Sequence, residues 1–198
     1  MPQYFDSDPA VASDAHTFDV VLPDVAFSLS TDRGVFSHGH LDTGTGLLLR
    51  EAPAPAAAGH LLDLGCGAGA IALTLARRSP DATVWAVDVN TRALQLTAAN
   101  AERNGIANVR AVAPDDVPAD IEFATIWSNP PIRIGKPALR ELLLRWFARL
   151  APGGTAVLVV QKHLGADSLH AWLTESGYPT ERLASRQAFR LLHSHPAA

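Results

Sequence analysis

The fold is decided by a glycine-rich turn that follows a short apolar run, Asp63-Leu64-Gly65-Cys66-Gly67-Ala68-Gly69. Residues 60–64 have the composition of a buried strand, and residues 68–78 carry apolar side chains at helical spacing. A strand, a glycine-rich turn and a helix in this order bring backbone N–H groups close to a ligand. Glycine allows the tight curvature and the close approach, because it has no side chain to clash.

Strands and helices alternate after this turn. We predict strands at residues 83–87, 108–113, 121–127 and 155–161, and helices at residues 91–103, 137–150 and 168–176. Residues 179–184 and 188–193 are two closing strands with no helix between them, which predicts a hairpin. The pattern predicts an α/β fold, a Rossmann-like and mostly parallel seven-stranded sheet with one antiparallel strand and helices on both faces.

The segment before the turn is less regular. Residues 17–22 and 25–30 are short β-like runs on either side of Pro23-Asp24, and residues 43–51 have a helical pattern. Residues 53–59 form a linker rich in Ala and Pro. We expect a single domain over residues 1–198, in which residues 1–40 are a β extension and residues 41–198 are the Rossmann-like core.

The composition limits the class of protein. The chain has 198 residues, of which 47% are apolar and 18% charged, and this favours a compact core over a disordered tail. Its net charge of -4 argues against a broad nucleic-acid footprint but allows local basic patches. A single cysteine excludes an internal disulfide, and we expect no metal. We see no signal peptide and no membrane-spanning run, so we expect a cytoplasmic protein with no membrane partner.

Carboxylates near the ends of the predicted strands suggest the kind of ligand. The glycine spacing alone fits both NAD and S-adenosylmethionine (SAM). Asp63 lies just before the turn, where it can accept from a cationic amino group and would repel a pyrophosphate. Asp88 ends the next strand, where it can accept from both hydroxyls of a ribose. Asp115 or Asp116 can accept from an adenine amino group.

A tandem proline motif, Asn129-Pro130-Pro131, follows the strand at residues 121–127. Prolines stiffen this turn and fix the direction of its carbonyl groups. An exocyclic amine is a poor nucleophile, because its lone pair is delocalised into the ring. The Asn129 side-chain oxygen and the Pro130 carbonyl can both accept from such an amine and free its lone pair. The motif therefore predicts methyl transfer from SAM to a planar nitrogen; alone, it would also fit a rigid loop.

With these motifs in this order, the sequence resembles the class I SAM-dependent methyltransferases. Within them it is similar to the small-subunit ribosomal RNA guanine-N2 methyltransferases. The resemblance runs from about Tyr4 to the C-terminus. It rests on Tyr4-Phe5 with Pro9, Gly34-Val35-Phe36-Ser37, Leu41-Asp42-Thr43-Gly44-Thr45, Leu62 to Gly69, Asp88, and Ser128 to Pro131.

This resemblance implies that SAM is the cofactor and that the acceptor is a guanine in ribosomal RNA or in the small ribosomal subunit. It implies a cofactor site made of Asp42, Thr43, Thr45, Asp63, Gly65, Gly67, Gly69, Asp88, Val89, Asp115 and Asn129. Catalysis is assigned to three residues that hold the target amine, Asn129, Pro130 and Pro131.

The substrate side departs from the family at one position. Amino-methylating relatives usually have an aromatic residue after Asn-Pro-Pro, which stacks on the base, and here that residue is Ile132. We expect Phe36 to supply a ring instead. Candidates for phosphate contacts are Arg133, Lys136 and Lys162. The alternative is that these side chains are ordinary solvated charges on the surface. We also expect this chain to lack the N-terminal half that two-domain bacterial members use in substrate recognition.

Other functions remain open at this point. Asn-Pro-Pro suits any planar amide or amine, so a protein glutamine amide or a small molecule is an alternative acceptor. A SAM-binding module without catalysis is a second alternative, which the intact motif disfavours. An NAD-dependent oxidoreductase is a third, which Asp63 disfavours.

Overall fold

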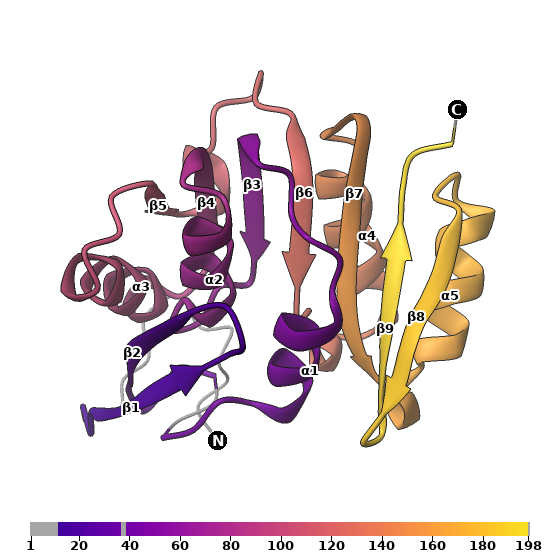
Figure 1. Ribbon diagram of the computed structural model, residues 1–198. Helices are drawn as coiled ribbons and strands as arrows, with labels where there is room; N and C mark the ends of the chain where they lie inside the picture. Colours follow the sequence, from indigo (N-terminus) through magenta and orange to yellow (C-terminus); the bar gives the residue numbers. More distant parts are fainter. Residues whose placement is uncertain (1–11, 37–38, 198) are drawn as a thin grey trace.

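The computed structural model describes residues 12–36 and 39–197, so Tyr4-Phe5, Pro9 and Ser37 of the family blocks lie outside the described residues. Its main sheet has seven strands, β3 (Ala58–Leu64), β4 (Asp81–Val87), β5 (Val109–Val112), β6 (Phe123–Ser128), β7 (Leu150–Gln161), β8 (Thr180–Arg186) and β9 (Phe189–Ser194). They lie in the order β5-β4-β3-β6-β7-β9-β8 (Figure 1). Strand β9 runs antiparallel to the other six strands, which are parallel to one another. The predicted fold class is confirmed.

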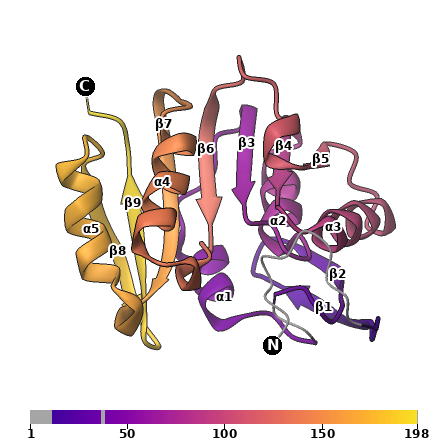
Figure 2. The same cartoon turned by 180° about the vertical axis from the view of Figure 1, so that it is seen from behind.

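Helices cover both faces of this sheet. One face carries α1 (Thr43–Glu51), α2 (Ala70–Arg78) and α3 (Thr91–Arg103), and the other carries α4 (Lys136–Phe147) and α5 (Ala166–Glu175) (Figures 1 and 2). Successive strand residues point to opposite faces, so Leu61 joins the apolar cluster of the first face and Leu62 that of the second. Among the described residues, no helix is both long enough and apolar enough to cross a membrane.

The predicted N-terminal hairpin forms a separate two-stranded antiparallel sheet, β1 (His16–Val21) with β2 (Ala26–Thr31). Asn100 of α3 and Asn104, the residue that follows α3, attach it to the core. The Asn104 side chain accepts from the backbone N–H of Ser28 at 3.0 Å and donates to its carbonyl at 2.7 Å. Asn100 does the same with Ser30, at 2.9 and 2.8 Å. The two side chains lie four residues apart on one helix face and pair with the backbone of β2. The division at residue 40 stays a prediction.

The boundary between α4 and β7 was predicted wrongly. We expected a helix to residue 150 and a strand from residue 155. In the structure α4 ends at Phe147 and β7 already begins at Leu150, which pairs with Phe123. A side chain at Gly154 would come within 2.6 Å of the Phe123 carbonyl oxygen. Glycine therefore allows β7 to continue beside β6 through a register shift.

Several other boundaries differ by about two residues. Strands β3 and β4 begin earlier than predicted, at Ala58 and Asp81. Helix α2 begins at Ala70 instead of residue 68, because Gly69 has a left-handed backbone with φ of 91°. The strands therefore extend into segments whose composition resembles loops.

Candidate active site

A cavity of about 630 Å³ opens at the carboxyl ends of β3, β4 and β6. Its walls include the glycine-rich turn after β3, the residues after β4 and the Asn-Pro-Pro turn after β6. The chain runs from β3 outward to β4 and β5, then returns to β6 on the other side. Ligands of open α/β sheets bind at such a point of reversal. The cavity volume lies in the range of small-molecule sites.

The glycines of the turn have different roles. Gly65 has φ of 79°, and no heavy atom lies within 4 Å of the position that a side chain would take, so a ligand can approach the backbone closely. Gly67 also lines the cavity. Gly69 is not among the lining residues, and a side chain there would lie 2.9 Å from Thr97 Oγ1. In this structure Gly69 packs the turn closely against α3, and its predicted cofactor role stays a prediction.

Asp88 lies on the cavity wall directly after β4. Its Oδ2 accepts from the N–H of Gly67, and its Oδ1 accepts from the N–H of Asn90, both at 3.0 Å. Burial raises the pKa of the Asp88 carboxyl, while these backbone hydrogen bonds act in the opposite direction. The carboxylate is thus held in a fixed orientation. Next to it, Val89 contributes a half-exposed apolar surface to the same wall.

Asp63 does not line the cavity. Its side chain is fully buried, and its Oδ2 accepts from the N–H of Ala72 in α2 at 2.9 Å. The other oxygen has no hydrogen-bond partner among the described residues. Burial raises the pKa of Asp63 well above its usual range, and the charge of Asp88 raises it further. In this structure Asp63 therefore joins the turn to α2, and its predicted role toward a cationic amino group stays a prediction.

Asp115 points away from the cavity as well. Its side chain is 89% exposed and forms an ion pair with Arg145 at 2.7 Å. The preceding residue, Pro114, lines the cavity instead. The chain segment expected near an adenine is thus in place, whereas the predicted carboxylate is turned outward.

Asn129 occupies the cavity wall after β6, and residues far away in sequence hold it. Its Nδ2 donates to Asp42 Oδ2 at 2.9 Å and to Thr45 Oγ1 at 3.0 Å. The same Asp42 oxygen caps α1 by accepting from the N–H of Thr45 at 2.8 Å. Because an ionised carboxylate can only accept, the amide nitrogen must face Asp42 and the amide oxygen must face elsewhere. Asp42 and Thr45 also line the cavity, but Thr43 is exposed and does not.

The prolines fix the backbone after Asn129. The N–H of Ile132 donates to the Pro130 carbonyl at 2.8 Å, and Pro131 between them has φ of −73° and ψ of 73°. These values define an inverse γ-turn, whose φ suits the proline ring. The Pro130 carbonyl keeps a second lone pair. The hydroxyl of Ser128 donates to the Leu64 carbonyl at 2.6 Å and ties the end of β6 to the end of β3.

The predicted substrate residues separate into two groups. Phe36, Ile132 and Arg133 line the cavity. Lys136 lines a smaller neighbouring cavity, and Lys162 lines neither of the two. Within the described residues, no group of three or more His, Cys, Asp or Glu side chains is placed to hold a metal ion.

Sequence reasoning missed Phe189, the first residue of β9, which also lines the cavity. Its ring packs so closely on α1 that a side chain at Gly44 would lie 2.8 Å from its Cε1. The preceding turn residues, Gln187 and Ala188, have φ of 47° and 66°. No local pattern connects Phe189 with Asn129, because only the fold brings β9 to this end of the sheet.

The reversal in strand order, the open glycine turn and the partly buried Asp88 define a Rossmann-like domain that can bind a nucleoside. The model of the methyltransferase small domain family matches residues 26–193, and the chain belongs to this family. The predictions of the family and of a SAM-dependent methyltransferase are confirmed.

Two relatives and one solved structure illustrate the similarity. The chain is 38% identical over 168 residues to the uncharacterized protein YbxB of Bacillus subtilis, covering 83% of this chain and 84% of that protein. It is 35% identical over 174 residues to ribosomal RNA small subunit methyltransferase C of Pseudomonas aeruginosa, covering 80% of this chain and 52% of that protein. The chain thus spans about half the length of this relative.

The solved structure is a 16S rRNA N2 methyltransferase of T. thermophilus, in complex with AdoMet and guanosine. It matches with a TM-score of 0.79 and 24% identity, covering 95% of this chain and 52% of that chain. This similarity confirms the fold.

Proposed function

We propose that this protein transfers the methyl group of SAM to the exocyclic N2 amine of a guanine in small-subunit ribosomal RNA. One observation carries the proposal. Asp42 and Thr45 hold the amide nitrogen of Asn129, so its amide oxygen is left as an oriented acceptor on the cavity wall. The match to ribosomal RNA small subunit methyltransferase C supports the choice of acceptor.

The residues around the glycine turn fit the cofactor. A ligand can pass close to the backbone of Gly65, where a side chain would meet no other heavy atom within 4 Å. Asp88 presents a fixed carboxylate whose remaining lone pairs can accept from ribose hydroxyls. Val89 adds an apolar contact. When bound, SAM supplies an electrophilic methyl group on a positively charged sulfur.

Two acceptors of the Asn-Pro-Pro turn act on the target amine. The Asn129 amide oxygen and the second lone pair of the Pro130 carbonyl accept its two hydrogens. These bonds favour a tetrahedral nitrogen, whose lone pair is no longer delocalised into the ring. Both acceptors are fixed before the substrate arrives, so little reorganisation is needed during the reaction. No strong base is required, because the amine proton becomes acidic once the nitrogen is alkylated.

Aromatic surfaces support a planar base as the acceptor. Phe36 and Phe189 both line the cavity, from segments far apart in the chain, although Ile132 follows the Asn-Pro-Pro turn. Stacking on one aromatic ring stabilises a bound base by roughly 1–3 kcal/mol. Phe189 lies against α1 beside Asp42, which contacts Asn129. A base on this ring would therefore lie near the proposed acceptors.

Methyl transfer from tritium-labelled SAM tests the proposal. Acceptors are an unmodified transcript of small-subunit ribosomal RNA, assembled small subunits and a protein extract, and labelled RNA is digested to nucleosides. We expect N2-methylguanosine from one of the RNA acceptors and at least ~100-fold slower labelling with Asn129→Ala. Label in another nucleoside, or in protein alone, would overturn the proposal that the acceptor is the N2 amine of a guanine. SAM binding without transfer to any acceptor would indicate a non-catalytic module.

A further inference from the structure

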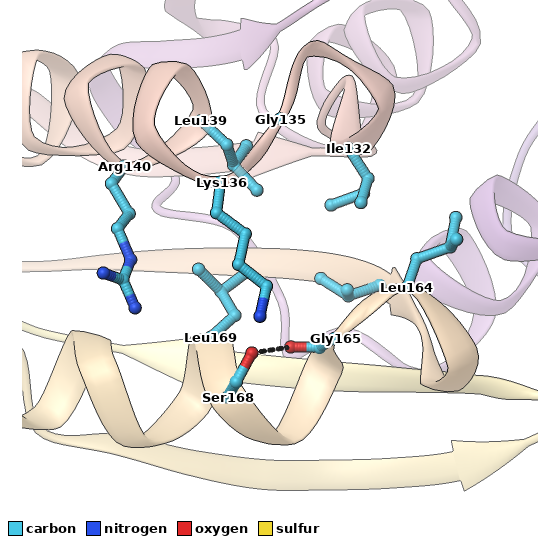
Figure 3. Close-up of a pocket in the computed structure, with 10 residues that line it drawn as sticks. Ile132, Gly135, Lys136, Leu139, Arg140, Leu164, Gly165, Ser168 and Leu169 are labelled. Carbon is cyan, nitrogen blue, oxygen red and sulfur yellow. Dashed lines mark hydrogen bonds between the residues drawn. The ribbon is translucent and has the colours of Figure 1, made fainter.

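A second cavity, of about 180 Å³, lies beside the Asn-Pro-Pro turn, between α4, the end of β7 and the start of α5 (Figure 3). Leu139, Val160 and Leu169 give it an apolar floor. Ile132 and Leu164 line both this cavity and the larger one. The two cavities therefore adjoin at the residue that follows the proposed catalytic turn.

Two cations reach into the smaller cavity from α4. Lys136 and Arg140 lie one helical turn apart, and both side chains extend toward α5 (Figure 3). Neither side chain has a hydrogen bond or an ion pair with the described part of the chain. The Arg140 guanidinium lies 5.0 Å from the ring centre of Trp172. Such a contact holds the planar group while its N–H bonds remain available to an anion.

The charge of these two residues is not neutralised locally. Six of the thirteen other arginines are paired with carboxylates, and these are Arg33, Arg78, Arg92, Arg145, Arg186 and Arg190. Asp167, in the first turn of α5, is one of those partners and pairs with Arg190. Glu141 on α4 is exposed and has no ion pair among the described residues. Although the net charge of the chain is -4, the two side chains thus give the smaller cavity an uncompensated positive charge.

We propose that Lys136 and Arg140 bind two successive backbone phosphates of the acceptor RNA, next to the nucleotide whose base enters the larger cavity. This inference rests on the proposed function and adds a subsite to it. Phosphate contacts position a strand and carry no sequence information. Two cations beside the place where the cavities adjoin fix the path of the RNA strand past Ile132. The apolar floor then contacts the adjoining sugar or base.

The salt dependence of RNA binding tests the subsite without relying on activity. The probe is a short fluorescein-labelled single-stranded RNA with one guanine, followed by anisotropy between about 50 and 200 mM salt. Each phosphate contact contributes about 0.7 to the slope of log Kobs against log salt for a single strand. We expect the double variant Lys136→Gln, Arg140→Gln to have a slope shallower by about 1.4. Raising salt over this range then weakens the wild type about sevenfold more than the variant.

Three variants serve as controls. Arg110→Gln removes one charge, as Lys136→Gln does, but on β5 at the opposite edge of the sheet, and we expect the wild-type slope. Lys136→Arg keeps the charge and should keep the slope as well. Lys136→Gln alone changes an exposed side chain, so its fold should survive, and its slope should fall by about 0.7.

The outcomes separate the two proposals. A wild-type slope in a folded double variant overturns the phosphate subsite, even if the wild-type protein methylates the RNA. A slope change in Arg110→Gln equal to that in Lys136→Gln overturns it too, because the effect would then come from net charge and not from this subsite. A shallower slope in the double variant, in a protein that methylates no RNA, supports the subsite and overturns the proposed function.

Discussion

Replacing Asp42 tests how the N-terminal part of α1 controls the catalytic amide. Asp42→Ala removes the cap of α1 and the hydrogen bond that orients Asn129, because one oxygen makes both. Loss of a helix cap costs about 1 kcal/mol, which lowers Tm by about 2–4 °C in a chain of this size. A hydrogen bond to a charged group contributes about 1.5–3 kcal/mol. If the amide loses that orientation, turnover should fall about 10-fold to 100-fold.

The matched variant is Asp42→Asn. Its side-chain oxygen can still accept from Thr45 and Asn129, so we expect a smaller loss of turnover at nearly the wild-type Tm. Turnover at saturating SAM and RNA is measured for both variants, and Tm is measured by calorimetry. Wild-type turnover in a folded Asp42→Ala protein would refute the reasoning, since Asn129 would then need no support from α1.

Four further predictions concern separate parts of the site. Asn129→Ala should lower turnover at least ~100-fold with SAM affinity near the wild-type value by calorimetry, and equal turnover would remove Asn129 from the mechanism. Asp88→Ala should weaken SAM binding. Burial raises the pKa of Asp88 above its ordinary value, and the ribose hydroxyls need the ionised carboxylate as acceptor. In the wild type, SAM affinity should therefore fall as pH drops through this pKa, and a pH-independent affinity would contradict the role. Phe189→Leu should raise KM for RNA about fivefold or more, whereas an unchanged KM would exclude stacking on this ring. Gly69→Ala should lower Tm by several degrees, because φ is 91° and the added carbon would meet Thr97 at 2.9 Å; a wild-type Tm would show that the turn can move.

Part of the site followed from local sequence patterns. The carboxyl ends of parallel strands meet at one edge of a sheet, so Gly65 after β3, Asp88 after β4 and Asn129 after β6 were expected to meet. The cavity confirms that they do. Side-chain direction was less predictable. Asp63 and Asp115 occupy the expected segments, yet one faces α2 and the other pairs with Arg145. Adjacent residues of a strand point to opposite faces, and motif spacing does not specify which residue of a strand or turn faces the ligand.

The sequence by itself determined the strand and helix order, the antiparallel closing hairpin and the three turns that form the cavity edge. These features depend on hydrophobic periodicity and on residues that are neighbours in the chain. Only the tertiary structure decided which distant groups complete the site. Asp42 contacts Asn129 across 87 positions, and Phe189 reaches the cavity from β9. Packing of α1 and β9 against the same sheet end sets these contacts, and no local pattern specifies them.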